Sequence, residues 1–145
     1  MTTKELRKRW RGNRRYTLKF VEAVPETSLG FKPVDGTKTY ASQLSHLTTW
    51  LRTHSRFVTE HEFEKVRPKT TADFQRYLTE FFDRIDHYLE TATEAELDQS
   101  VKVWYGTVSK QFILATMENH LAHHRGQLVV YLRLLGVTPP SYVGW

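Results

Sequence analysis

The chain has 145 residues, of which 39% are hydrophobic and 13% aromatic, enough for one folded domain with a buried core and too many for a disordered chain. It contains no cysteine, which excludes disulfides, iron–sulfur clusters, thiolate zinc sites and cysteine nucleophiles. The net charge is +5, and we expect a single domain over residues 1–145.

The basic charge gathers at the N-terminus. Residues 1–15 hold seven basic side chains against the single acid Glu5: Lys4, Arg7, Lys8, Arg9, Arg11, Arg14 and Arg15. The rest of the chain is close to neutral, which weakens the inference of nucleic-acid binding that a high isoelectric point invites. A non-catalytic or nucleic-acid-binding helical protein that uses this segment, with Trp10 for stacking, stays open as the alternative function.

No segment has the character of a membrane or export signal. The first ten residues, MTTKELRKRW, show no apolar run after their charges, and no stretch approaches the roughly 20 apolar residues of a membrane span. We therefore expect a cytoplasmic protein with no membrane partner.

Apolar residues recur at helical spacing in the first half of the chain. A first helix is predicted over residues 4–24, ended by Pro25. Residues 25–39 are rich in turn formers and predict a long connection, which permits a crossover in a helical bundle. A second helix is predicted from about Thr39–Ser42 to Val58.

The second half predicts two more helices with an irregular segment between them. Thr70 or Thr71 can cap a third helix that ends near Thr91. Residues 92–108 are mixed, with a short extended excursion around 101–107. The last helix is predicted from near Ser109 to Leu135, with Gly136 just beyond its end. The sequence thus predicts an all-α fold, a four-helix bundle.

Two histidines in the last helix suggest a metal site. His120 and His124 are four residues apart, so they project from one helical face and can bind one ion. His124 shares its face with Leu128 and Tyr131, which a bundle helix turns inward. A buried histidine pair needs partners, and a shared metal ion supplies one.

A third ligand must come from another element, and His46 is favoured because Leu44 and Leu47 flank it on the edge of an apolar face. The other histidines fit a solvated surface better: His54, His61 and His87, with His123 beside the site or on the surface. A three-histidine site leaves coordination positions open for chemistry. No acid is placed as a general base, since Glu118 points away from His120, which favours activation of water or a thiol by the metal itself.

Residues 119–140, NHLAHHRGQLVVYLRLLGVTPP, strongly resemble the closing signature of the DinB-like (YfiT-like) superfamily. Segments within residues 15–47, including SQLSHL at 42–47, resemble the first half of that family. The resemblance implies a four-helix bundle of up-down-down-up topology and a homodimer. It also implies that His46, His120 and His124 are the metal ligands. Within the signature, we interpret Gly126 as allowing close approach of another helix, and Gln127 as bonding to a neighbouring helix.

The resemblance further implies a metal-dependent enzyme, either a low-molecular-weight-thiol S-transferase or a hydrolase, acting on a small molecule. The cofactor is expected to be one divalent ion per chain, zinc or nickel before iron or manganese. Basic residues of the first helix, Arg7, Arg11, Arg14 or Arg15, are candidates to hold the carboxylates of a thiol substrate.

Overall fold

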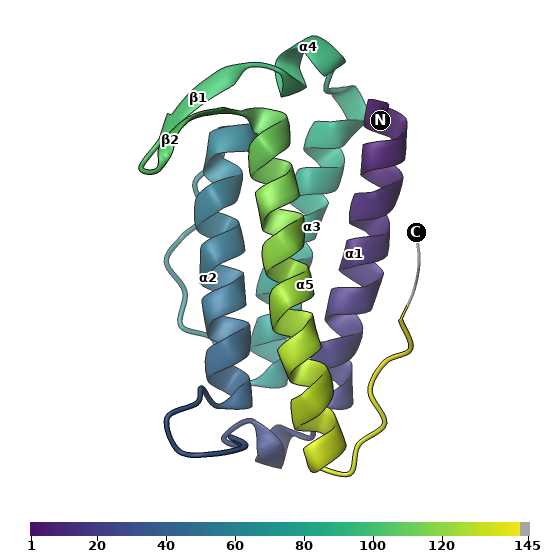
Figure 1. The fold of residues 1–145 in the computed structure, drawn as a ribbon, viewed down its shortest axis with the longest axis vertical. Coiled ribbons are helices and arrows are strands. Elements are labelled where there is room, and N and C mark those ends of the chain that lie inside the picture. Colours follow the sequence, from purple (N-terminus) through teal and green to yellow (C-terminus); the bar gives the residue numbers. More distant parts are fainter. Residues whose placement is uncertain (143–145) are drawn as a thin grey trace.

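The computed structural model describes residues 1–142. Four long helices form the body of the molecule: α1 (Thr3–Ala23), α2 (Tyr40–Thr59), α3 (Thr71–Thr91) and α5 (Lys110–Leu134) (Figure 1). The short elements are the 3-10 helix η1 (Glu26–Ser28), the helix α4 (Glu94–Leu97), and the strands β1 (Ser100–Val103) and β2 (Gly106–Ser109). The two strands form an antiparallel hairpin in which Ser100 pairs with Ser109. The predicted all-α four-helix bundle is confirmed, and the expected excursion near residue 101 is this hairpin.

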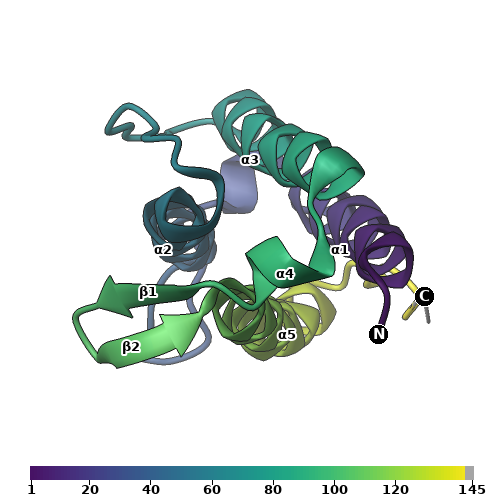
Figure 2. The ribbon, with the colours of Figure 1, turned by 90° about the horizontal axis from the view of Figure 1, so that it is seen from above.

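The first and last long helices run in one direction and the middle two in the opposite direction, which is the up-down-down-up arrangement turned upside down in Figure 1. There, α1 and α5 run down the page while α2 and α3 run up it. Seen from above, α3 and α5 each lie between α1 and α2, so α1 and α2 are diagonal to each other (Figure 2). The connection over residues 24–39 therefore crosses the end of the bundle, as its length allowed. The segment 60–70 runs back along the bundle, because the neighbours α2 and α3 are parallel (Figure 1).

Local capping chemistry sets the helix ends. Thr2 and Thr70 begin α1 and α3 with capping boxes, in which each hydroxyl accepts from the third helical amide. Thr39 caps α2 through a hydrogen bond from the Ser42 amide. Gly136 follows α5 with φ at +72°, the left-handed conformation that ends helices and favours glycine. All four signals act within a few residues, which is why the sequence predicts these boundaries well.

The apolar stripes of the helices meet in one core. The apolar stripe of α2 (Leu44, Leu47, Leu51 and Val58) is fully buried. On α1, Trp10 packs edge-on against Phe81 of α3, with ring centroids 6.1 Å apart. Among the described residues, no helix combines the length and the apolar character that crossing a membrane requires.

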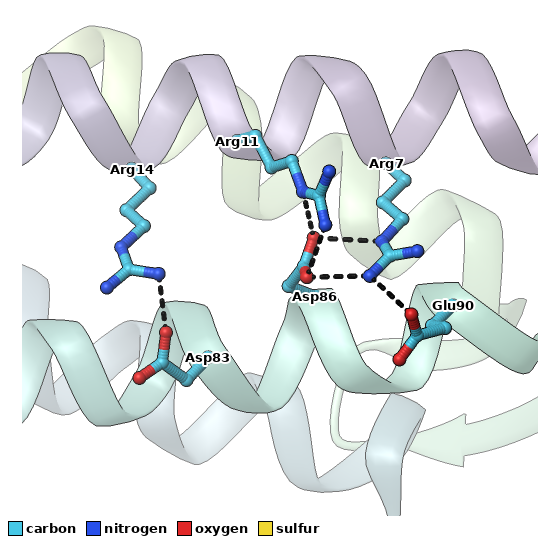
Figure 3. Close-up of polar contacts among 6 residues, drawn as sticks. All are labelled: Arg7, Arg11, Arg14, Asp83, Asp86 and Glu90. Atoms are coloured by element: carbon cyan, nitrogen blue, oxygen red, sulfur yellow. Dashed lines mark hydrogen bonds and ion pairs between the residues drawn. The ribbon is translucent and has the colours of Figure 1, made fainter.

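Arginines of α1 form ion pairs with acids of α3 (Figure 3). Arg7 and Arg11 both bind the carboxylate of Asp86 through two hydrogen bonds each, at 2.7–3.0 Å. Arg14 pairs with Asp83 in the same row. These three arginines therefore connect α1 to α3 through ion pairs, which argues against their holding the carboxylates of a substrate.

Replacing Asp86 by asparagine is expected to destabilise the protein in a pH-dependent way. The Arg7 and Arg11 guanidinium groups hold the pKa of Asp86 well below its usual range. The ionised group therefore adds stability above the unfolded-state pKa of about 4, and this contribution is lost as the pH falls through the lower folded-state pKa. Allowing for solvent screening, we expect a loss of about 1–2 kcal/mol at pH 7 that shrinks in acid.

Urea denaturation of Asp86→Asn at neutral and acidic pH measures this difference. Asp98→Asn is the matched control, because Asp98 is exposed and follows α4 rather than facing α1. A deficit in Asp86→Asn that stays constant with pH would contradict the ion-pair account.

Candidate metal centre

Three histidines from two helices meet on one side of the bundle. His46 lies on α2, and His120 and His124 lie one turn apart on α5. Each offers a ring nitrogen, and these three atoms lie within 4.8 Å of one another. Within residues 1–142, no other set of three or more metal-ligating side chains comes this close together. The geometry thus brings together the three residues that the sequence and the resemblance selected.

The packing of α2 against α5 produces this cluster. His120 and His124 flank Leu121, which is fully buried in the core, while His46 lies next to the buried Leu47. The ring centroid of His46 lies 5.2 Å from that of His120 and 5.0 Å from that of His124. The imidazoles therefore sit at the edge of the apolar interface, with the core behind them.

A hydrogen-bond network fixes the ring of His124. Its Nδ1 is 2.7 Å from Oε1 of Gln43, a buried residue one turn before His46. The Gln43 amide nitrogen in turn donates to Oε1 of Gln127 and to the hydroxyl of Tyr131. Because Gln43 presents its oxygen to His124, the Nδ1 must carry the proton and Nε2 keeps its lone pair. Outer partners of this kind orient metal-binding histidines.

His120 has a buried ring nitrogen that lacks a hydrogen-bond partner among the described residues, its Nε2. Leaving a buried acceptor unsatisfied costs about 1–3 kcal/mol, so such atoms call for an explanation. The ring of Trp50 stacks on His120 with centroids 4.0 Å apart and holds its orientation. A metal ion would satisfy the orphaned nitrogen, so the residues present fit such an ion.

The electrostatics also suit a cation. Burial lowers the pKa of His120 to about 3 and that of His124 to about 4. Burial, with a contribution from the Lys38 charge, also lowers the pKa of His46. All three imidazoles are therefore neutral at pH 7, which is the form that binds metal ions.

The histidines open onto a surface pocket of about 710 Å³. Its walls come from the segment before α2, from α2 and from α5: Thr37, Lys38, Gln43, His46, His120, His123, His124, Gln127, Val130 and Tyr131. None of these residues carries a carboxylate. Glu118, as expected, faces elsewhere: it is buried against α1, where Arg9 and Asn13 donate to it. No carboxylate on the pocket wall can act as a general base.

The structure confirms some of the other sequence-based interpretations and contradicts others. Gln127 does bond to a neighbouring helix, through Gln43. The interpretation of Gly126 is wrong, since nothing among the described residues comes within 4 Å of a Cβ placed there. His87 is exposed as expected, but His54 is only 1% exposed. His54 is buried because its ring stacks on Trp50 and the hairpin residue Trp104 packs over it.

Sequence reasoning missed Gln43, Trp50 and Lys38. Gln43 lies one turn before His46, and a polar residue at that spacing from a ligand is the signal that was available. Trp50 lies one turn after His46, on the same face of α2. Lys38 lies in the connection before α2, which has no helical periodicity from which the position of a side chain could be predicted.

The fold and the site together define a class: a four-helix bundle with a three-histidine cluster at the floor of an open pocket. A model of the DinB family matches residues 1–144 of the chain. The chain belongs to the DinB family.

Known relatives agree in fold along nearly the whole chain. The uncharacterised protein YjoA of Bacillus subtilis strain 168 is 23% identical over 132 residues, which cover 87% of this chain and 86% of YjoA. The crystal structure of YjoA, a DinB-like protein, superposes with a TM-score of 0.76 at 18% identity and covers 97% of this chain and 96% of that one. A DinB-like protein from Bacillus cereus ATCC 10987 superposes with a TM-score of 0.86 at 21% identity, covering 98% of both chains.

Proposed function

We propose that this chain is a metal-dependent enzyme that holds one divalent ion on His46, His120 and His124. The observation that carries the proposal is the cluster of three histidines with ring nitrogens within 4.8 Å of one another. A buried ring nitrogen of His120 without a hydrogen-bond partner in the described part of the chain supports it. Neutral nitrogen donors suit zinc or nickel, and iron or manganese less well. Three protein ligands leave coordination positions free toward the pocket, as in catalytic rather than structural sites.

We further propose that the reaction is transfer of a low-molecular-weight thiol to an electrophile. A divalent ion bound there would act as a Lewis acid that lowers the pKa of a coordinated thiol or water. The pocket wall has no carboxylate to act as a general base, so the ion itself must activate the nucleophile. A thiol favours this arrangement over water, because its free pKa is far lower and it needs less activation. In thiol transfer, the S–H proton goes to solvent, a carbon–sulfur bond forms, and the leaving group departs with its electron pair.

Turnover assays on metal-loaded protein test this proposal. A panel of small thiols with a chlorinated fluorogenic electrophile is expected to show metal-dependent transfer in the wild type and almost none in His120→Ala. His87→Ala is the matched control, because His87 is exposed on α3. Full metal occupancy without transfer from any thiol would contradict thiol transfer, and hydrolysis of activated esters by the same sample would support the hydrolase instead.

Nucleic-acid binding by the basic N-terminal segment is less well supported. Arg7, Arg11 and Arg14 are paired with acids of α3, and Arg9 is paired with Glu118 of α5. Most of the excess charge is therefore balanced within the fold.

The homodimer that the resemblance implies stays a prediction.

A further inference from the structure

The charge of the pocket is unbalanced. Among the described residues that line the pocket, Lys38 is the only lysine, and no arginine, aspartate or glutamate is present. A divalent ion held by three neutral imidazoles keeps its full charge. The loaded pocket would therefore carry about three positive charges with no protein anion to compensate them.

Lys38 is built into the site rather than placed near it by chance. The hydroxyl of Tyr131 donates to the backbone carbonyl of Lys38 at 2.7 Å. Tyr131 is buried, and the same hydroxyl accepts from Gln43, which also binds His124. Thr39, the next residue, caps α2. The backbone of Lys38 is thus tied through two side chains to the metal-site histidine.

The ammonium group of Lys38 is available to a ligand. Across residues 1–142, Lys38 has no ion pair with any acidic side chain, unlike Lys32 and Lys110. Lys38 lines the same pocket as His46 and His124. A small ligand that reaches the histidines can therefore meet the ammonium at the same time.

From this geometry we propose that Lys38 selects a thiol that carries a carboxylate. The thiol sulfur lies at the metal, and the carboxylate pairs with the Lys38 ammonium. Such a ligand brings two negative charges, which offset two of the about three positive charges of the loaded pocket. The inference rests on the proposed function, and it assigns to Lys38 the role first considered for the arginines of α1.

Equilibrium binding to the cobalt-loaded full chain tests this proposal. Mercaptoacetate and the uncharged mercaptoethanol are titrated separately, and the sulfur-to-cobalt charge-transfer absorption reports binding without any turnover. In Lys38→Met, we expect the affinity for mercaptoacetate relative to mercaptoethanol to fall about five- to tenfold at low salt. The affinity for mercaptoethanol is expected to stay unchanged, and Lys38→Arg is expected to restore the preference.

The ratio of the two thiol affinities is compared between variants, so that any difference in how strongly each thiol binds cobalt by itself cancels. Lys102→Met is the matched control, because Lys102 is exposed on β1 and lies outside the pocket wall. If both thiols bind and their affinity ratio is the same in wild type and Lys38→Met, the role of Lys38 is overturned and the proposed function stands. If neither thiol gives a charge-transfer band in wild type with cobalt bound, the proposed thiol chemistry is overturned as well.

Discussion

Replacing His120 by leucine is expected to weaken metal binding by about two to three orders of magnitude while leaving the metal-free protein at least as stable as the wild type. The loss follows because one of three ligands is removed. The stability should hold because the substitution also removes a buried Nε2 that has no hydrogen-bond partner in the described part of the chain. Such an atom costs stability, so the metal-free variant is expected to gain about 1 kcal/mol.

Zinc competition titration and urea denaturation of chelator-treated protein measure the two effects. His87→Leu should leave metal affinity unchanged, because His87 is exposed and outside the cluster. A variant at His120 that binds metal like the wild type would show that this residue is not a ligand. A variant that loses affinity only because it unfolds would point to a structural role.

Replacing Gln43 by leucine is expected to lower metal affinity by about 10- to 100-fold without touching a ligand. The Gln43 Oε1 accepts the hydrogen bond of His124 Nδ1 and so keeps the lone pair on Nε2. Leucine is similar in size but accepts no hydrogen bond, so His124 is free to turn or to change tautomer. Gln43→Glu loses the amide donor, as leucine does, but keeps an acceptor for His124, so it is expected to retain more of the wild-type affinity than Gln43→Leu.

Nitrogen-15 NMR of the histidine rings in metal-free protein gives an independent readout. His124 should be protonated on Nδ1 in the wild type and in Gln43→Glu, and should shift toward the other tautomer in Gln43→Leu. Equal affinity and equal tautomers in all three proteins would show that the Gln43–His124 contact does not prepare the site.

The parts of this molecule that the sequence predicts well depend on local chemistry. Thr2 and Thr70 cap helices through residues three positions away, and the stripe containing Leu44 and Leu51 repeats at helical spacing. The His120–His124 pair is local in the same sense, since one helical turn separates the two rings. The spacing of that pair did not select the third ligand. The edge of an apolar face favoured His46, and the resemblance to a known family pointed to the same residue.

Long-range pairings could not be predicted in this way. Arg7 and Arg11 meet Asp86 across more than 70 residues, and nothing in the basic run indicates its partner. His54 looked like a surface residue because its cover, Trp104, comes from a hairpin elsewhere in the chain. Lys38 reaches the pocket only because Tyr131 holds its backbone there. Each depends on how the helices pack, which periodicity does not specify.

X-ray absorption spectroscopy of the zinc-loaded protein can detect the three histidine ligands themselves. After removal of adventitious metal and reloading, we expect one ion per chain with three imidazole nitrogens at about 2.0–2.1 Å. A solvent molecule is expected at the remaining coordination position, and a sulfur atom is expected to replace it when a thiol is added. An ion that binds without imidazole scattering, or a chain that retains no ion, would contradict a metal centre built from His46, His120 and His124.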